Sequence, residues 1–200
     1  MTNNNILKQF NDLIKKRPVF LDTETTGLGP DAQVCEIAVV ALDGSVLLDS
    51  LVKPTVPIPP GAEAIHHISN EMVSGSPSFY DLMLDLGEAL GGSHLCIYNA
   101  EYDMRVMRQS AEVNKFRFVD FLRGRTRSVD DRDCIMKLYA EYWGAWSDYH
   151  QSYTFQSLSE AVKKQVVNLP EGLVLHRALA DAELTRLLTI ELGERYEIPF

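Results

Sequence analysis

The spacing of apolar residues changes several times along the chain, and each change predicts a different kind of element. Apolar residues at helical spacing alternate with short runs rich in valine, leucine and isoleucine that are typical of strands. Asp43-Gly44 lies between two of these runs and predicts a hairpin turn. The predicted strands cover residues 19–22, 34–42, 46–52 and 95–98. The predicted helices cover residues 3–16, 79–90, 102–113, 131–142 and 178–196, with one more that follows Thr154 as its N-cap.

The order of these elements predicts an α/β fold. The first strands form an antiparallel meander, whereas the later part of the chain alternates strand and helix. Residues 53–69, rich in proline, are expected to form the loop between the two parts. No repeat, low-complexity tract or linker divides the 200 residues, a length that suits one domain. We therefore expect a mixed sheet flanked by helices in a single domain, 1–200, with a helical N-terminal extension of about residues 1–17.

The composition, 46% hydrophobic and 24% charged residues, is typical of a soluble globular protein. No apolar run reaches the roughly 18–20 residues that span a bilayer, and the N-terminal segment lacks the layout of a signal peptide. The three cysteines, Cys35, Cys96 and Cys134, form no C-x-x-C motif, which favours reduced thiols over disulfides or zinc. These features predict a cytoplasmic protein with no membrane partner.

The charge is unevenly distributed. A net charge of −9 argues against binding to nucleic acid, which rests on lysine and arginine. Residues 105–137, however, hold nine basic and five acidic residues, a net charge of +4, and the remainder carries −13. Arg123, Arg125 and Arg127 fall in a predicted loop of this segment. The loop is either an ordinary solvated surface or a polyanion-binding rim beside an acidic, metal-binding site.

Two acids, Asp22 and Glu24, stand at the end of the first predicted strand. On an extended chain both side chains leave the same face, about 6–7 Å apart at the backbone, and can converge on one cation. Thr25-Thr26-Gly27 then supplies a turn whose backbone can approach a ligand closely. Four acid-x-acid pairs occur among the chain's 28 acids, about the number expected by chance. Taken alone, the pair is better explained by a strand end that reaches solvent.

Two later acids fall where core residues are expected. Asp181 shares its predicted helical face with Leu184 and Leu188, and Asp103 lies on the apolar stripe of its own helix. An unpaired carboxylate at such a position is destabilising. N-capping is an equally good explanation for Asp103, but not for Asp181, which lies well inside its helix. Core-facing carboxylates would repel one another unless cations held them, and oxygen ligands without cysteine favour Mg²⁺ or Mn²⁺.

His176 supplies a candidate general base, because an imidazole with a pKa of about 6.5 suits deprotonation of water at neutral pH. On one helix His176 and Asp181 would point about 140° apart. They can reach one site only if His176 precedes the helix on a loop, as the preceding Pro170-Glu171-Gly172 suggests. Without the acid nearby, a lone histidine is more often an ordinary surface residue.

Three ordered segments together resemble the DEDDh group of 3′–5′ exonucleases, which includes the epsilon subunit of bacterial DNA polymerase III, ribonuclease T and oligoribonuclease. The segments are FLDTETTGL at 20–28, NAEYD at 99–103 and HRALAD at 176–181, and AIHHIS at 64–69 is similar to the group's I-H-G-I segment. The resemblance extends from residue 19 to about 190. It implies an RNase H-like fold with a mixed five-stranded sheet, an antiparallel meander followed by parallel strands. It also implies release of nucleoside 5′-monophosphates from a 3′ end with two divalent ions, Mg²⁺ or Mn²⁺.

Carried over residue by residue, the resemblance implies a role for each motif position. Asp22, Glu24 and Asp181 would bind the first metal, Asp22 and Asp103 the second, and His176 would be the general base.

The resemblance also implies a seat for the terminal nucleotide. The turn would hold its 3′-hydroxyl, Leu28 would wedge against the last base, and two residues from other segments, His66 and Asn99, would line the pocket. The turn residues are Thr25, Thr26 and Gly27. His67 departs from the pattern, because it stands where the group has glycine, and we expect it to alter how the pocket closes.

The leading hypothesis is therefore a metal-dependent exonuclease acting on single-stranded or frayed 3′ ends, DNA in the first place. The alternatives are an exoribonuclease that trims RNA 3′ ends, of the ribonuclease T or oligoribonuclease kind, and a module that mainly docks on a DNA polymerase or on a second copy. An aromatic cluster holds seven of the chain's 18 aromatic residues and is either a stacking platform for bases or, more commonly, core and interface packing. The cluster comprises Tyr139, Tyr142, Trp143, Trp146, Tyr149, Tyr153 and Phe155.

Overall fold

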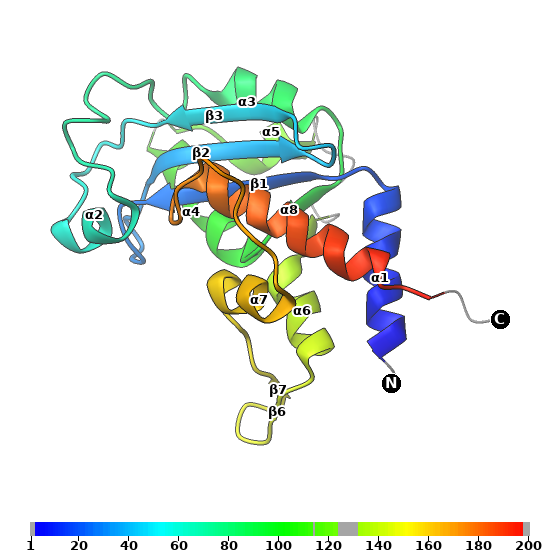
Figure 1. Cartoon of the computed structure of the whole chain (residues 1–200). Helices are drawn as coiled ribbons and strands as arrows, with labels where there is room; N and C mark the ends of the chain where they lie inside the picture. Colours follow the sequence, from blue (N-terminus) through cyan, green and yellow to red (C-terminus); the bar gives the residue numbers. More distant parts are fainter. Residues whose placement is uncertain (1–2, 114, 124–131, 198–200) are drawn as a thin grey trace.

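A five-stranded mixed sheet forms the centre of the computed structural model, which describes residues 3–113, 115–123 and 132–197 (Figure 1). Its strand order is β3-β2-β1-β4-β5. The pairs β1–β2 and β2–β3 are antiparallel, whereas β1–β4 and β4–β5 are parallel, which confirms the expected α/β architecture. The strands are β1 Val19–Thr25, β2 Val34–Ala41, β3 Val46–Leu51, β4 Leu95–Ile97 and β5 Arg132–Cys134.

Helices cover both faces of the sheet, and a small two-stranded hairpin projects away from it beyond α6 and α7 (Figure 1). The helices are α1 Asn3–Lys15, α2 Pro60–His66, α3 Met83–Leu90, α4 Ala100–Glu112, α5 Phe118–Arg123, α6 Ile135–Trp143, α7 Leu158–Gln165 and α8 Ala178–Glu194. The hairpin pairs β6 Trp146–Ser147 with β7 Ser152–Tyr153. None of the helices in the described ranges is long and apolar enough to cross a membrane.

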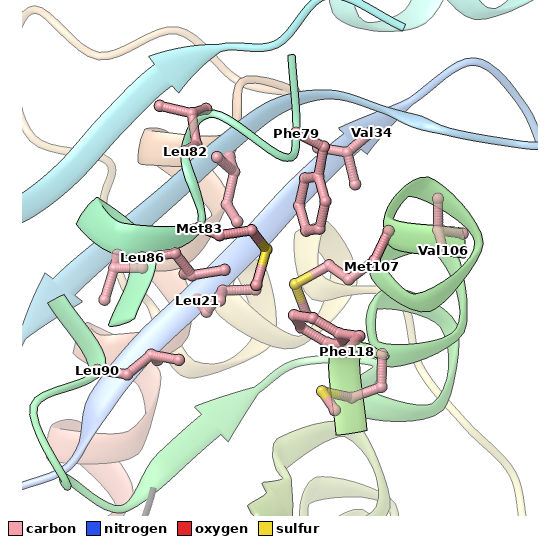
Figure 2. Close-up of a cluster of buried hydrophobic side chains, with 14 of the residues drawn as sticks. Leu21, Val34, Phe79, Leu82, Met83, Leu86, Leu90, Val106, Met107 and Phe118 are labelled. Atoms are coloured by element: carbon pink, nitrogen blue, oxygen red, sulfur yellow. The ribbon is translucent and has the colours of Figure 1, made fainter. Parts of the chain in front are cut away.

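The alternation of side chains along β1 divides the core into two layers. Val19 and Leu21 point to the face covered by α3, α4 and α5, where Figure 2 shows Leu21 packed among side chains such as Met83 and Met107. Phe20 points to the opposite face, which α1, α6, α7 and α8 cover. Because successive residues alternate, Asp22 and Glu24 continue the series of Phe20 and face α8.

The N-terminal helix α1 packs closely on the second half of α8. Gly193 makes this approach possible, since a Cβ atom there would overlap Ile14 and lie 3.1 Å from the backbone of Asn11. The side chain of Asn11 donates a hydrogen bond of 3.1 Å to the Gly193 carbonyl. The contact fixes α8 at the end away from its first turn, which carries Asp181.

Three local predictions were wrong. Residues 60–66 form a helix rather than a loop, because Pro60 occupies the first helical position, where a missing N–H costs nothing. Residues 132–134 form the parallel edge strand β5, so α6 begins at Ile135 rather than at 131. Helix α7 begins after Ser157, whose hydroxyl accepts from the Glu160 N–H, and not after Thr154.

Two further predictions concern side chains. Cys35, Cys96 and Cys134 are free thiols, as the sequence predicted, and the first two are buried. Arg123 ends α5, and Arg125 and Arg127 lie outside the described residues. The basic rim therefore stays a prediction.

Candidate active site

Three carboxylates meet where β1 leaves the sheet. Asp22 and Glu24 project from β1, and Asp181 comes from the first turn of α8, the helix that covers this face of the sheet. One oxygen from each of the three carboxylates lies within 4.8 Å of the other two. The cross-strand partner of Asp22 on β2 is Ala38, whose small side chain leaves room for the helix. The structure thus gathers acids that lie more than 150 residues apart in the sequence.

The electrostatics of this cluster favour a bound cation. Removal from water, followed by repulsion from Asp103, Asp181 and Glu24, raises the pKa of Asp22 well above its usual range. Burial and the charge of Asp181 raise the pKa of Glu24 to about 8. Burial likewise raises the pKa of Asp181. Hard oxygen donors that repel one another fit a divalent cation such as Mg²⁺ or Mn²⁺, which would relieve the repulsion.

Asp103 belongs to the same site but reaches it from the other face of β1. It lies in the first turn of α4 with an exposed fraction of 3%, and it accepts a hydrogen bond of 2.8 Å from the Thr23 hydroxyl. Asp103 lies outside the three-carboxylate group, yet its charge is the strongest charge acting on Asp22. Burial raises the pKa of Asp103 to about 7. The N-cap position of α4 is occupied by Asn99, so helix capping does not explain Asp103.

His176 precedes α8 on a loop, as its angular relation to Asp181 required. Its backbone is left-handed, with φ of +58°, its side chain is exposed, and Arg177 is the N-cap residue of the helix. Burial raises the pKa of Asp181, and the charge of His176 acts in the opposite direction. The loop therefore holds His176 directly before the helix that carries Asp181.

A partly buried ion pair that sequence reasoning missed holds this loop in place. Glu36 of β2 is the cross-strand partner of Glu24, and both of its oxygens accept from the Arg177 guanidinium, at 2.9 and 3.0 Å from Nε. One of these oxygens also accepts from the Ala178 N–H at 2.8 Å. A glutamate inside the apolar run of β2 was the signal, since such a charge needs a partner. The pair ties the start of α8 to the strand that neighbours β1.

A pocket of about 450 Å³ adjoins the carboxylates, a volume within the range of small-molecule sites. Glu24 belongs to both the pocket and the carboxylate group. The predicted residues Thr25, Thr26, Gly27, Leu28 and His66 all line the pocket, whereas Asn99 is not one of its lining residues.

Helix α2 forms the other wall of this pocket. Pro59, Gly61, Ala62 and Ile65 line it from α2 and its N-cap, and Tyr102 closes it from α4. Ile65 and Leu28 are both exposed apolar side chains, with exposed fractions of 58% and 81%, that border the pocket. Sequence reasoning missed Ile65 because it assigned this segment to a loop.

The two adjacent histidines have different environments. His66 is buried; its Nδ1 accepts from the Ile68 N–H at 3.0 Å, and burial lowers its pKa, so the ring forms a neutral wall of the pocket. His67 is the C-cap residue of α2, with left-handed backbone at φ of +59°. Glycine adopts this conformation without strain, which explains why a glycine suits the position. The His67 side chain is exposed and does not line the pocket.

The aromatic cluster divides into two parts. Tyr139 is fully buried in the layer around α8 and is a core residue. Most of the others are exposed on and around the β6–β7 hairpin, where Trp146 and Tyr153 pack edge to face at 5.2 Å. The exposed members are Trp143, Trp146, Tyr149, Tyr153 and Phe155.

Several relatives and structures are similar to this chain. The exonuclease CP81 of Escherichia phage 186, described as uncharacterized, is 37% identical over 188 residues, 92% of each chain. Exodeoxyribonuclease 10 of Escherichia coli K12 is 30% identical over 175 residues, which cover 86% of this chain and 66% of that protein. The DNA polymerase III epsilon subunit of Rickettsia typhi is 29% identical over 174 residues, 84% of this chain and 70% of that subunit.

Among solved structures, exonuclease X in complex with 5′ overhanging duplex DNA matches with a TM-score of 0.63 and 30% identity, over 88% of this chain and 90% of that one. Exonuclease I of E. coli in complex with a dT13 oligonucleotide matches with a TM-score of 0.67 over 89% of this chain and 41% of that one. At 17% identity, the second match supports the fold alone.

These findings confirm the resemblance to exonucleases that the sequence motifs indicated. The model of the RNase T exonuclease family matches residues 19–189, which include all the residues that form the carboxylate group, the histidine loop and the pocket. The chain therefore belongs to the RNase T family of exonucleases and is a nuclease, a hydrolase of phosphodiester bonds.

Proposed function

We propose that this enzyme is a metal-dependent 3′–5′ exonuclease that removes nucleoside 5′-monophosphates from single-stranded or frayed DNA ends. The observation that carries the proposal is the sharing of Glu24 between a carboxylate cluster and a pocket of nucleotide size. A terminal nucleotide seated in the pocket would bring its 5′-phosphate to the carboxylates, so that each cleavage releases one nucleotide.

The residues divide the chemistry among themselves. Asp22, Glu24 and Asp181 would hold one divalent ion, and Asp22 with Asp103 a second, because these are the carboxylates whose mutual repulsion a cation relieves. Two such ions, when bound, supply activation of the attacking water and stabilisation of the leaving oxygen. His176 would accept the proton of the attacking water and pass it to solvent, which its exposed loop reaches directly.

The pocket would contribute positioning rather than chemistry. The turn of β1 would hold the terminal sugar, and Leu28 and Ile65 would contact the base from opposite walls. Apolar contacts of this kind accept any base, which suits an enzyme that degrades a chain regardless of sequence.

DNA is the proposed substrate because the names of three similar proteins refer to DNA. They are an exodeoxyribonuclease, a DNA polymerase subunit, and an exonuclease whose structure was solved with duplex DNA. The proposal is tested by a time course on 5′-labelled single-stranded DNA, duplex DNA and RNA with Mg²⁺ or Mn²⁺. Asp22→Ala and Asp181→Ala should each abolish hydrolysis and leave the circular dichroism spectrum unchanged. EDTA should also abolish hydrolysis by the wild type. Hydrolysis in EDTA would exclude the metal mechanism, and preferential loss of RNA would favour an exoribonuclease.

A second candidate function is docking on a polymerase or on another copy of the chain. The observation that favours it is the exposed aromatic group on the projecting β6–β7 hairpin, since exposed tryptophan and tyrosine are common at protein interfaces (Figure 1). The epsilon subunits among the relatives point to a polymerase. Negligible activity of the isolated chain, restored by a replicative polymerase, would support docking as the main function.

A further inference from the structure

A row of exposed aromatic side chains begins on the β6–β7 hairpin and continues along the segment that leads to α7. Trp146 and Tyr153 are cross-strand partners, and their rings pack edge to face with centroids 5.2 Å apart. The Thr154 N–H donates to the Ala145 carbonyl at 2.8 Å, so the two segments stay paired one step beyond the strands. Because Tyr153 and Phe155 are two residues apart on this extended segment, their side chains leave the same side. Trp146, Tyr153 and Phe155, with exposed fractions of 52%, 38% and 55%, thus form one aromatic row.

The aromatic row is joined to the candidate active site through Tyr98. The parallel register of β1 and β4, continued by one residue, places Tyr98 beside Asp22. Tyr98 packs in the same core layer as α8, and its hydroxyl donates to the Gln156 carbonyl at 2.9 Å. Gln156 follows Phe155 directly in the chain. The row therefore begins one tyrosine side chain away from the strand position beside Asp22, and it extends from there to the hairpin.

Base stacking suits this surface better than phosphate binding. The chain has a net charge of −9, and exposed acids such as Asp148 and Glu160 lie on the hairpin and on α7. The Lys164 ammonium lies 4.2 Å from the centroid of the Trp143 ring and donates to the Gln156 side chain, so it is already engaged by the protein. Stacking on aromatic rings requires no excess of positive charge, and every base has a face that can stack. The surface therefore fits a single-stranded nucleic acid, whose bases are free to stack, rather than a duplex.

We propose that the aromatic row binds the single strand on the 5′ side of the scissile phosphate, with Phe155 as the ring nearest to the carboxylates. The inference rests on the proposed function, which seats the terminal nucleotide in the pocket and its 5′-phosphate at the carboxylates. Glu24 lines the pocket, whereas Asp22 and Tyr98 do not. The preceding nucleotides of the strand therefore lie beyond Asp22, on the side where Tyr98 leads to the row.

The length of the row sets the number of nucleotides that it holds. Gln156 and Tyr153 are three residues apart, which is about 10 Å on an extended chain. Neighbouring bases in a stacked strand are about 3.4 Å apart, so the row accommodates about three nucleotides before the terminal one. A strand that lacks the bases of these nucleotides would lose the contact while it keeps every phosphate.

The test compares two 5′-labelled single-stranded oligodeoxynucleotides of the same length. Both end in an ordinary 3′ nucleotide, but in one of them the three preceding positions are abasic. For the wild-type enzyme, KM for the first cleavage should be roughly tenfold or more higher for the abasic strand, the effect expected when bases no longer stack on aromatic rings. Phe155→Leu keeps an apolar side chain without a ring. It should raise KM for the intact strand, leave KM for the abasic strand and both kcat values unchanged, and so lower the ratio at least about threefold.

Tyr80→Leu is the matched control, because Tyr80 is a half-exposed aromatic residue whose ring contacts Phe116 on the face of the sheet covered by α3, α4 and α5. It should keep the wild-type ratio, as should Phe155→Tyr, which retains a ring, and thermal unfolding confirms the fold of each variant. Equal KM values for the two strands in the wild type, or an unchanged ratio in Phe155→Leu, would overturn the inference. Weaker binding of Phe155→Leu to a DNA polymerase, with that ratio unchanged, would assign the row to protein docking instead. Absence of cleavage of both strands by the wild type would overturn the proposed function.

Discussion

Asp103→Asn should stabilise the metal-free protein at alkaline pH, although it removes a residue proposed to bind metal. Burial raises the pKa of Asp103 to about 7, from a reference value of 3.8. Between these values the folded protein holds a proton that the unfolded chain has released, so stability falls as the pH rises through this window. The asparagine carries no such proton, and its side-chain oxygen can still accept the hydrogen bond from Thr23.

The size of this stability difference follows from the part of the pH window that lies between pH 5 and pH 8, the two values at which stability is compared. Over about two pH units between pH 5 and pH 8, the folded wild type keeps the Asp103 proton that the unfolded chain has lost. Its free energy of unfolding therefore falls by about 3 kcal/mol over this range. The fixed cost of burying the amide is the same at both pH values and cancels in the difference. Loss of the Asp103 charge also lowers the pKa of Asp22, which adds to the effect in the same direction.

The assay is urea denaturation in EDTA at both pH values, with Asp148→Asn as the control for an exposed carboxylate. The stability of Asp103→Asn relative to the wild type should improve by about 2–3 kcal/mol between pH 5 and pH 8, while the control shows no such trend. Addition of Mg²⁺ should reverse the order, because the wild type gains binding energy that the variant lacks. If the variant and the wild type differ in free energy of unfolding by the same amount at both pH values, the pKa of Asp103 is not raised in the folded protein.

The remaining predictions concern the proposed general base, the ion pair between Glu36 and Arg177, and the pocket. His176→Ala should lower kcat by about 10²- to 10⁴-fold with little change in KM; an unchanged kcat would argue against its role as general base. Glu36→Gln should lower the free energy of unfolding by about 1.5–3 kcal/mol, since Arg177, whose side chain is 32% exposed, loses a charged hydrogen-bond partner; chemical denaturation measures this, and an unchanged midpoint would mean that the pair does not anchor α8. Leu28→Ala should raise KM and leave the melting temperature unchanged, because the side chain is 81% exposed; a lower melting temperature would show a packing role instead.

The parts of the site that follow from backbone periodicity could be predicted from the sequence. The period of two along β1 placed Asp22 and Glu24 on one face, and the structure confirms that both face α8. The period of 3.6 along α8 required His176 to lie before the helix, and it does. Such predictions succeed because they depend on chain geometry that holds whatever the neighbours are.

The parts that depend on tertiary contacts could not be predicted. Strand β5 is three residues, Arg132–Cys134, without alternation, and only its pairing with β4 makes it a strand. The partner of Glu36 lies 141 residues away at Arg177. The contacts of the Tyr102 hydroxyl have no signal in the sequence, because its partners, Thr25 and the Gly27 carbonyl, lie about 75 residues away. Helix α2 was not predicted because several prolines lie around it, although one of them, Pro60, is its first residue.

The ion pair between Glu36 and Arg177 determines how the site would fill with metal. The pair fastens α8 to β2 through protein groups alone, so the position of Asp181 opposite β1 would not depend on a bound ion. An incoming Mg²⁺ must shed part of its water shell, which it does reluctantly, but it need not wait for the backbone to rearrange. Loading of the proposed site would then be a matter of ion dehydration, and a chelator should remove the ion without unfolding the protein.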